Sequence, residues 1–413
     1  MSFSLNRQAL GGMKNNYTTE ELANIPEYDS IQFLYLFNEG TEADIEMHNI
    51  VFDRKTPATY GASVATNSEL DGTYVAGVAP DWSIDAGVTA TETTDDINAT
   101  PAQLLSNLNG AGQAFRQTGI TITDGQIYIV EAGLRCNSGA GNVAISFDGM
   151  KDTATYSVST ANLAPVTGYS VIKFFVVANG ASTIFQLTAD SVGIELEVSQ
   201  MSLKPVGGGN HMVMNHSLYD RSERGDNYYD FNGTDHYFAI DEARQSNLDL
   251  QNKWSCVTIL RVDGAQNGSL TSKWNAVGNQ RGWQAFRVLT ANRRLETYWS
   301  STGTNAISQV SANNTIPAHP WASYACIGTS FNEGVVTFVL NGVLLTNGSS
   351  VGTGTTIYDN TTDVLMGAAY NPTGDLAAFF EGRLGKQIIW SGAALTLAQH
   401  KHVFNILRSA YGI

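Results

Sequence analysis

The sequence predicts an all-β protein with two jelly-roll or β-sandwich domains, a short N-terminal arm and a C-terminal helix. The chain has 413 residues, of which 40 are Gly and only 15% are charged. This composition is typical of turn-rich β proteins with polar, weakly charged surfaces. Short apolar stretches also recur at the spacing of strands, separated by Gly, Asn and Asp turns. Two Asn-Gly pairs, at residues 232–233 and 341–342, lie between such stretches and favour tight hairpins.

Charge and cysteine content exclude several classes of protein. The net charge of −15 argues against nucleic-acid binding and against anionic membranes. No stretch approaches the roughly 20 apolar residues of a membrane span, and the N-terminus has no apolar run of signal-peptide length. Cys136, Cys256 and Cys326 are odd in number and form no metal-binding pattern, so we expect buried free thiols.

The N-terminal region divides into two segments. Residues 1–28 are expected to form an arm with a short helix, since Thr18 and Glu21 make a capping box. This arm either docks onto a partner or is a frayed terminus. Residues 29–60 contain a strand, 31–37, that is apolar on both faces, which is typical of a buried strand.

Residues 61–206 read as one β domain. Their apolar stretches alternate with Gly, Asn and Asp turns, and their number and spacing predict a jelly roll. The strands are expected at residues 82–84, 88–91, 114–118, 120–122, 127–134, 142–147, 170–177, 183–187 and 194–203. Residues 207–227 follow as a Gly-rich hinge and a charged loop.

This middle segment resembles the carbohydrate-binding-module type of jelly roll found beside polysaccharide-degrading enzymes and in phage tail and head appendages. Residues 82–84 (Trp-Ser-Ile) resemble its early tryptophan strand. Residues 115–128 resemble the glutamine strand that leads through a turn into a tyrosine strand, and 194–203 resemble the closing strand. That strand usually carries an aspartate near its start, where this chain has Glu195 and Glu197, which puts the family's calcium site in doubt.

Residues 228–413 read as a second sandwich. Residues 229–240 are expected to form a hairpin around Asn232-Gly233, and residues 335–345 a second one around Asn341-Gly342. Further strands are expected at residues 254–262, 282–289, 294–299, 321–328, 364–367 and 379–390. Thr396 and Gln399 cap a final helix that covers part of the sandwich.

Four motifs in this region resemble the laminin-G-like branch of the concanavalin A-like lectin/glucanase superfamily. They are residues 229–233 (Tyr-Asp-Phe-Asn-Gly), 338–342 (Phe-Val-Leu-Asn-Gly), 380–386 (Phe-Glu-Gly-Arg-Leu-Gly-Lys) and 395–399 (Leu-Thr-Leu-Ala-Gln). The third motif normally carries an acid where Gly385 stands. The resemblance implies a sandwich fold and says little about activity.

The same branch opens with a strand that ends in an aromatic residue, an acid and a glycine, and residues 35–40 resemble that opening. We therefore hypothesise that residues 29–60 supply the first strand of the C-terminal sandwich and that the jelly roll is inserted after it. The alternative is a separate N-terminal element that docks on another protein.

The sequence favours binding over catalysis. Glycoside hydrolysis needs two facing carboxylates, and the acid-x-acid-x-x-acid strand of the glucanase branch is absent from residues 228–413. Glu195 and Glu197 alternate in the middle segment, where a solvated strand face is the expected role. No Ser/His/Asp motif and no phosphate-binding loop occurs, so we expect no enzyme.

Sugar binding needs an aromatic ring that stacks on a pyranose, with polar groups that hold the hydroxyls. Trp274, beside Lys273 and Asn275 in a stretch that reads as turn-rich, is the favoured candidate. The full set of carbohydrate-binding candidates is Trp82, Trp274, Trp283, Trp299 and Tyr370. Calcium is common in both fold families, and the candidate metal ligands are Asp230, Asp235 and Asp359.

We therefore predict a structural protein of a bacteriophage virion, such as a head decoration, head fibre or tail appendage, that adheres to surface glycans. It would be made in the host cytoplasm and joined to other virion proteins by the N-terminal arm. Appendages of this kind are often symmetric, so a homo-oligomer is expected, with a trimer favoured by analogy. Host-surface polysaccharide is the expected ligand. The alternative is a non-catalytic carbohydrate-binding module protein of a bacterium.

Overall fold

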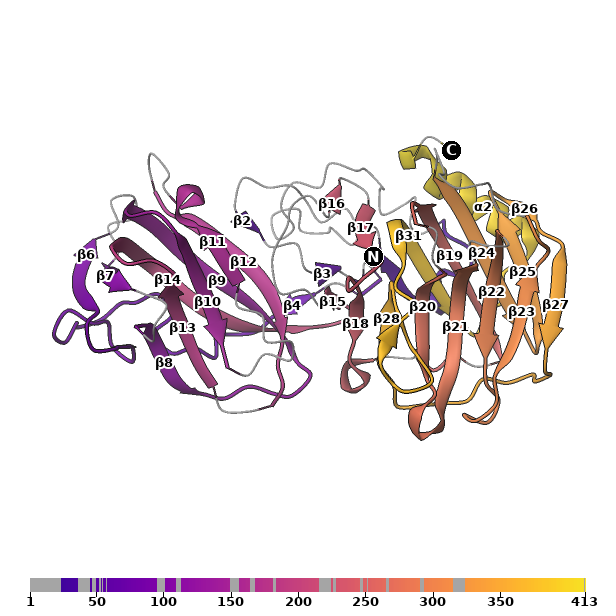
Figure 1. Cartoon of the computed structure of the whole chain (residues 1–413), viewed down its shortest axis with the longest axis horizontal. Coiled ribbons are helices and arrows are strands. Elements are labelled where there is room, and N and C mark those ends of the chain that lie inside the picture. The colour runs from indigo at the N-terminus through magenta and orange to yellow at the C-terminus, as the bar shows by residue number, and fades with distance from the viewer. Residues whose placement is uncertain are drawn as a thin grey trace.

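The chain folds into two β-sandwiches that lie end to end, joined by a narrower junction (Figure 1). The fold is that of a computed structural model, which describes residues 24–35, 45–46, 50–51, 53, 55–56, 58–94, 101–108, 113–148, 156–163, 168–180, 183–214, 224–225, 228–245, 248–250, 252–264, 267–289, 293–314, 324–411 and 413. The capping box expected at Thr18 lies outside these residues. Among the described helices, none has the length and apolar character needed to cross a membrane.

The middle segment forms a jelly-roll sandwich of two sheets. Within the described residues, one sheet has the order β11 (Tyr156–Ser159), β10 (Asn142–Phe147), β13 (Thr183–Ala189), β8 (Phe115–Ile120) and β5 (Ser83–Ile84). The other has the order β2 (Ile45–Glu46), β12 (Ser170–Val177), β9 (Ile127–Ser138), β14 (Ile194–Gly207), β7 (Pro101–Leu108) and β6 (Thr89–Thr94), with β4 (Thr59–Tyr60) also paired to β14. A core that includes Phe115, Phe174 and Phe185 fills the space between them.

The C-terminal segment forms a larger sandwich. One of its described sheets has the order β16 (Arg224–Gly225), β17 (Tyr228–Asn232), β31 (Glu381–Ser391), β19 (Lys253–Val262), β24 (Ala325–Asn332), β25 (Val335–Leu340) and β26 (Val343–Leu344), with β1 (Ile31–Tyr35) also paired to β31. The other has the order β27 (Asn347–Val351), β23 (Ile307–Ser311), β22 (Arg294–Trp299), β21 (Gln280–Leu289), β20 (Gly268–Asn275), β28 (Val364–Met366), β18 (Phe238–Ile240), β15 (Met212–Met214) and β3 (Ile50–Val51). We call these the β31 sheet and the β21 sheet. The predicted all-β class with two sandwiches is confirmed.

The expected hairpin at residues 229–240 is wrong. β17 pairs with β31, whereas β18 pairs with β28 and β15 in the opposite sheet, so the turn carries the chain across the sandwich. The side-chain oxygen of Asn232 accepts hydrogen bonds from the backbone N–H groups of Thr234, Asp235 and His236, which builds a wider turn than a two-residue hairpin allows. The rings of Phe231 and Phe238 then meet edge-on between the sheets.

The second Asn-Gly pair forms the predicted hairpin. Asn341 and Gly342 both have positive φ, 49° and 76°, as a type I′ turn requires. Leu340 pairs with Val343 across the turn. The same dipeptide therefore makes a hairpin in one place and a crossing between sheets in the other.

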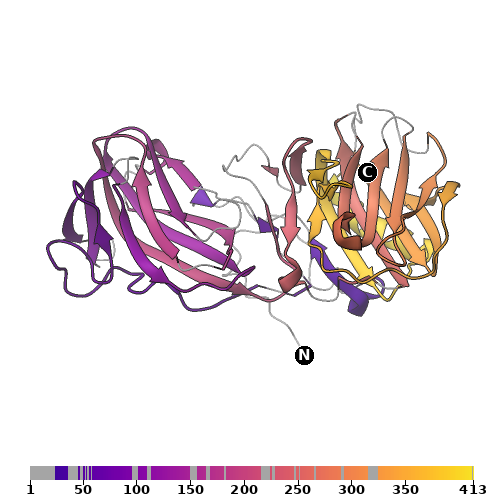
Figure 2. The ribbon, with the colours of Figure 1, turned by 60° about the horizontal axis from the view of Figure 1, so that its bottom comes forward.

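The first described strand, β1, belongs to the C-terminal sandwich by its hydrogen bonding. It runs antiparallel to the second half of β31, with Leu34 opposite Ile388, while β17 lies along the first half of β31. The chain then leaves this sandwich, builds the jelly roll and returns through β14 and β15. Figure 2 shows β14 running from the jelly roll into the junction.

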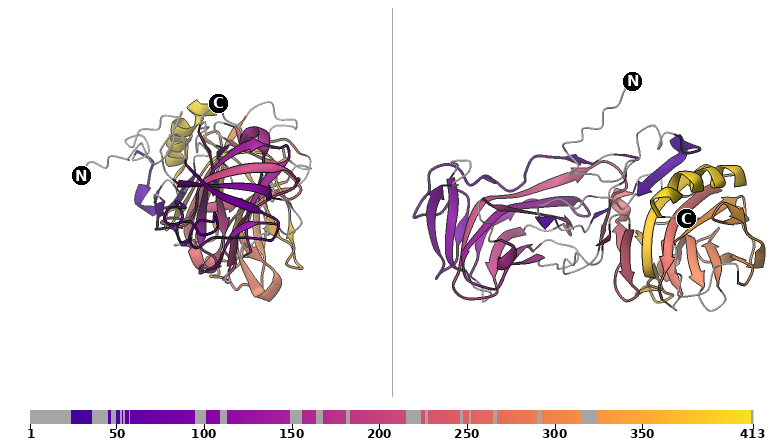
Figure 3. Two further views of the ribbon diagram at one scale, coloured as in Figure 1. Left: turned by 90° about the vertical axis from the view of Figure 1, so that its left-hand side faces the viewer. Right: turned by 90° about the horizontal axis from the view of Figure 1, so that it is seen from above.

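The C-terminal helix covers the outer face of the β31 sheet. Helix α2 (Leu397–Leu407) begins at a capping box formed by Thr396 and Gln399, as predicted. Val403 and Leu407 face the sheet, where they join Ile31 and Leu34 of β1 in one apolar cluster. Seen from above, β1 and α2 lie on the same side of the sandwich (Figure 3). Leu397, the first residue of the helix, is exposed.

The junction between the two sandwiches has a small core of its own. Ile127, Ile129 and Phe175 of the jelly roll pack with other apolar side chains from β3, β14 and β15, namely Ile50, Val206 and Val213. Tyr60 of β4 lies opposite Val206 of β14, so the outgoing and returning chains run side by side here. The hinge expected at Gly207–Gly209 lies here too, with Gly207 opposite Thr59 and Gly209 against Asp53 and Thr56.

Several strands were not predicted from the sequence. They include β7 and β11 of the jelly roll and β20, β23 and β27 of the C-terminal sandwich. β20 contains Trp274, which was expected in a turn-rich stretch. This segment reads Gly-Ser-Leu-Thr-Ser-Lys-Trp-Asn and lacks a clean apolar alternation, because bulges interrupt its pairing with β21.

Candidate binding surface at the rim of the C-terminal sandwich

Three of the predicted sugar-binding tryptophans are core residues. Trp82 is buried and stacks on Phe115, with ring centroids 4.7 Å apart. Trp283 and Trp299 are buried between the two sheets of the C-terminal sandwich. The expectation of an exposed stacking platform at these positions is therefore corrected, because each of these rings points into a core, where a large apolar surface is removed from water.

Trp274 and Tyr370 lie outside the main core but are also covered. Trp274 is buried and meets the ring of Tyr298 edge-on at 5.8 Å. Tyr370, in the short strand β29 (Ala369–Tyr370), which pairs with β30 (Leu376–Ala377), is half-buried and packs on a small cluster around Tyr237 and Leu365. Neither ring stands free as a platform for a sugar.

The three predicted metal ligands are not brought together. Asp230 forms an ion pair with Arg383, in which Asp230 Oδ2 lies 3.1 Å from Arg383 Nε. Asp235 is exposed and accepts a hydrogen bond from Asn232. Among the described residues, no group of three or more His, Cys, Asp or Glu side chains is arranged to hold a metal ion.

Residues 352–363, which we call the rim segment, lie across one end of the β21 sheet. Three hydrogen bonds tie this segment to the ends of successive strands. The indole N–H of Trp299 donates to Gly354 O at 3.1 Å, the backbone N–H of Tyr358 to Ser300 O at 2.6 Å, and the Asn360 amide to Gln280 O at 2.9 Å. The rim segment is therefore held in a fixed course over β22 and β21.

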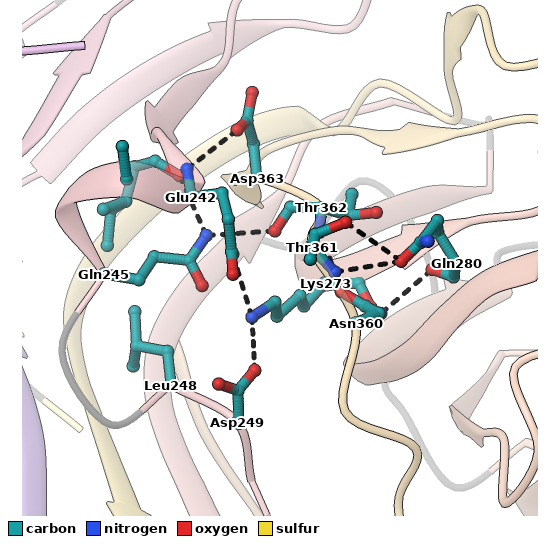
Figure 4. Close-up of polar contacts among 12 residues, drawn as sticks. Glu242, Gln245, Leu248, Asp249, Lys273, Gln280, Asn360, Thr361, Thr362 and Asp363 are labelled. Carbon is teal, nitrogen blue, oxygen red and sulfur yellow. Dashed lines mark hydrogen bonds and ion pairs between the residues drawn. The ribbon is translucent and has the colours of Figure 1, made fainter. Parts of the chain in front are cut away.

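A buried lysine lies beneath the rim segment (Figure 4). The Lys273 side chain is only 1% exposed, and its ammonium group forms ion pairs with Asp249 and, at 3.1 Å, with Glu242. A buried charge needs such partners, because its removal from water costs several kcal/mol. Burial raises the pKa of the Glu242 carboxyl, against the lowering effect of Lys273. Burial and the neighbouring Asp249 raise the pKa of Asp359.

The carboxylates around Lys273 are positioned by local turns. Asp241 caps the short helix η4 (Glu242–Arg244), and the Glu242 N–H donates to Asp363 at 3.0 Å. The Gln245 side chain donates to Thr362 O at 3.0 Å. Figure 4 shows Glu242 of η4 and Asp249 pointing at the Lys273 ammonium, while Gln245 and the Glu242 backbone link η4 to Thr362 and Asp363 of the rim segment. The site thus joins three stretches that are far apart in the sequence.

Tyr358 is the exposed aromatic residue of this rim. Its side chain is 37% exposed. A Cβ added at Gly303 would lie 2.7 Å from Tyr358 Cε1, so the ring rests closely against this glycine. The Gly303 loop is held in turn by Arg281, whose guanidinium donates to Thr304 O at 2.9 Å, and by Asn305, which accepts a hydrogen bond from Ser300 Oγ at 2.6 Å.

The surface around Tyr358 is rich in exposed hydroxyl and carboxyl groups. Four exposed polar residues lie in the rim segment or in the Gly303 loop that Tyr358 contacts. They are Thr302, Thr304, Asp359 and Thr361. An aromatic ring with fixed hydroxyl and carboxylate neighbours can stack on a sugar ring and hold its hydroxyls. Sequence reasoning missed Tyr358, although an aromatic and an acid directly after a Gly- and Thr-rich run were a visible signal.

The alternating carboxylates of the jelly roll have structural partners. Glu197 accepts hydrogen bonds from Arg135, from the Asn137 amide at 2.8 Å and from the Tyr169 hydroxyl at 2.9 Å. Glu195 accepts a long hydrogen bond from Ser138. Glu197 is thus a nearly buried member of a polar cluster, where a solvated strand face was expected.

No protein-family model and no curated protein matches the sequence. Solved structures that are similar include the CBM40 module of a Ruminococcus gnavus sialidase bound to α2,6-sialyllactose, with 14% identity and a TM-score of 0.34 over 42% of this chain and 96% of that one. The CBM22-1 xylan-binding domain of Paenibacillus barcinonensis has 10% identity and a TM-score of 0.25 over 35% of this chain and 95% of its own. The receptor-binding domain of a botulinum neurotoxin has 10% identity and a TM-score of 0.32, over 44% and 42% of the two chains. Likeness at these values carries no inference about a ligand.

Proposed function

We propose that this protein is a non-catalytic glycan-binding protein and that the rim around Tyr358 is its binding surface. The observation that carries the proposal is the exposed Tyr358 ring, seated against Gly303 and fixed by the hydrogen bond from its own backbone to Ser300. A ring held in this way loses little conformational freedom when a sugar stacks on it, so more of the contact energy appears as affinity.

The charges of the rim indicate which glycans would be favoured. Three carboxylates, Glu242, Asp249 and Asp359, surround Lys273, and Arg281 supplies a further positive charge. Carboxylates outnumber cations, so an acidic sugar would meet net repulsion here. The proposed ligand is therefore a neutral or amino-bearing polysaccharide.

A glycan array tests this proposal, with Tyr358→Ala compared to the wild-type protein. The matched control is Tyr60→Ala, because Tyr60 is similarly exposed, at 42%, and belongs to β4, which pairs with β14 and not with the strands under the rim segment. We expect Tyr358→Ala to lower affinity for a bound neutral glycan by about tenfold or more, since ring stacking supplies of the order of 1 kcal/mol beyond area burial. Equal loss in both variants, or no binding by the wild type, would overturn the assignment.

The proposed setting is a bacteriophage particle, where the chain would serve as a structural appendage that adheres to host-surface polysaccharide. The three cysteines support folding in a reducing cytoplasm, since all are buried free thiols. Mass spectrometry of purified particles would find the chain if this setting holds. Its absence there, with polysaccharide-utilisation genes beside its gene, would favour the alternative of a bacterial carbohydrate-binding protein.

A further inference from the structure

β27 is an edge strand with both faces in solvent. It is the outermost described strand of the β21 sheet and pairs only with β23 on its inner side. All five of its residues, Asn347–Val351, are exposed. A strand that has one hydrogen-bonded neighbour and no cover on either face leaves a row of backbone groups available to another strand.

The neighbouring edge of the other sheet lies on the same side of the sandwich. β26 is the outermost described strand of the β31 sheet and precedes β27 directly in the sequence. The Asn347 amide reaches across to donate to Val336 O at 2.8 Å, which holds β27 beside β25. Figure 1 shows both edges at the end of the molecule away from the jelly roll.

This side of the sandwich carries exposed apolar side chains. Val335, Val343 and Leu344 are exposed on β25 and β26, and Val351 of β27 is 62% exposed. Exposed apolar groups beside an unpaired strand edge are typical of an interaction site, since isolated monomers usually guard such edges with charges or proline.

No such guard is present here. Residues 334–358 contain no Asp, Glu, Lys, Arg, His or Pro, although the whole chain has a net charge of −15. Two copies of this chain repel each other over most of their surfaces, and an uncharged edge is where two copies can meet without like-charge repulsion. A cationic partner would be attracted to the acidic remainder of the surface instead.

We propose that β27 pairs antiparallel with β27 of a second copy of this chain, so that the β21 sheets of two molecules form one continuous sheet. A two-fold axis at Ser349 places Gly348 opposite Ser350 and Asn347 opposite Val351 of the partner. Small residues at the centre let the two strands approach, and no charged side chain meets its own copy. The dimer presents two rims, which would raise avidity for a repeating polysaccharide.

The test measures the molar mass of the full chain by light scattering and analytical ultracentrifugation across a dilution series. We expect a dimer for the wild type and a weaker one, by about tenfold or more in dissociation constant, for Val351→Lys, because a lysine on an edge strand opposes pairing with another strand and here replaces an exposed apolar side chain. Val192→Lys is the matched control, since Val192 is an exposed valine of the jelly roll, at 78%, and should leave dimerisation unchanged.

A cross-link tests the register. Paired Cα atoms of antiparallel strands lie about 5.5 Å apart or closer, which suits a disulfide, and the native cysteines are all buried. Ser349→Cys should therefore oxidise to a covalent dimer much faster than Val192→Cys. A monomeric wild type, a trimer, an unaffected Val351→Lys variant or equal cross-linking of the two cysteine variants would each overturn the proposal.

Discussion

Asp53 is the residue on which the junction between the two sandwiches converges. Its buried carboxylate accepts hydrogen bonds from the backbone N–H groups of Leu34 at 3.1 Å, Lys55 at 2.9 Å and Asn210 at 3.0 Å. Its own N–H donates to the His211 ring at 3.0 Å. One side chain thus links β1, the outgoing chain and the returning chain. The returning chain passes close to this carboxylate at Gly209, where an added Cβ would lie 2.7 Å from Asp53 Oδ2.

We expect Asp53 to make the free energy of unfolding depend on pH. Burial raises its pKa from 3.8 to about 6, against the lowering effect of its backbone donors. The folded state therefore holds the proton more tightly, so this contribution is fully present below pH 3.8 and is lost as pH rises through about 6. The loss amounts to about 3 kcal/mol, since each pKa unit corresponds to about 1.4 kcal/mol. Denaturant unfolding of Asp53→Asn at several pH values checks this.

The Asp53→Asn variant has lost the ionisable group, so the stability of the wild type relative to this variant should decrease as pH rises from 4 to 6. Because an amide offers one acceptor oxygen, the variant is also less stable at every pH. Stability curves for the two proteins that run parallel across this range would show that Asp53 does not titrate as proposed.

Residue patterns predicted some of the chemistry at this scale and missed the rest. The cysteines were expected to be buried free thiols, and all three are. The roles of aromatic rings were harder to predict, because the sequence does not state which face of a strand is covered. Trp283 and Tyr358 both follow Gly-containing turns, yet one fills the core and the other lies on the rim. Lys273 was named only as a neighbour of Trp274, since its acidic partners come from distant segments.

At the scale of elements, helix α2 is attached to the β31 sheet by a polar contact under its first turn. His400 is buried, and its Nε2 atom lies 2.7 Å from Ser330 Oγ. The Ser330 hydroxyl is also 2.8 Å from Ser255 Oγ, so the histidine completes a hydrogen-bonded row between the helix and strands β24 and β19. Gly328 makes room for the imidazole, because an added Cβ would lie 2.5 Å from His400 Nδ1.

We expect α2 to loosen in acid. Burial lowers the pKa of His400 from 6.5 to about 4, so the folded state disfavours the protonated ring. Its contribution to stability is present above pH 6.5 and is lost as pH falls toward 4, by about 3 kcal/mol. This slope is opposite to that of Asp53, and the two nearly cancel in the wild type. The His400→Gln variant should therefore become more stable relative to the wild type below pH 6. The measurement is the difference between the free energies of unfolding of the two proteins at each pH, and a difference that is the same at pH 7 and pH 4 would contradict the prediction.

Local signals predicted individual elements better than they predicted their partners. The capping box of α2 is local to Thr396 and Gln399 and was confirmed. The Asn341-Gly342 hairpin is equally local. The Asn232-Gly233 pair does not form a hairpin, although its local sequence favours one. Phe231 and Phe238 lie on strands of opposite sheets, and the burial of both rings between the sheets requires the turn to cross the sandwich. β20 was missed because bulges conceal its alternation.

At the scale of the whole molecule, the chain order of the two sandwiches is interleaved. β1 pairs with β31, more than three hundred residues later, and β3 pairs with β15 across the entire jelly roll. The doubly apolar pattern of residues 31–37 predicted that this strand needs a larger sheet, but only the family resemblance indicated which one. A local pattern states that a strand is buried and does not identify the strand that pairs with it.

This topology predicts that the C-terminal sandwich can fold without the jelly roll. Because Tyr60 and Val206 are paired neighbours, residues 61–205 can be replaced by Asn-Gly, a two-residue turn that joins the two chains where they already run antiparallel. Ile50, Val206 and Val213 would lose cover from the jelly roll, at a cost of up to about 2 kcal/mol each. We expect a folded protein with a single cooperative thermal transition, measured by circular dichroism and calorimetry, at a lower temperature than the full chain.

If β1 were merely docked on the sandwich, deletion of residues 1–60 as well would leave this transition unchanged. Our topology instead requires that the further deletion abolishes it, because β1 fills a place beside β31 and covers Ile388 and Trp390 together with α2.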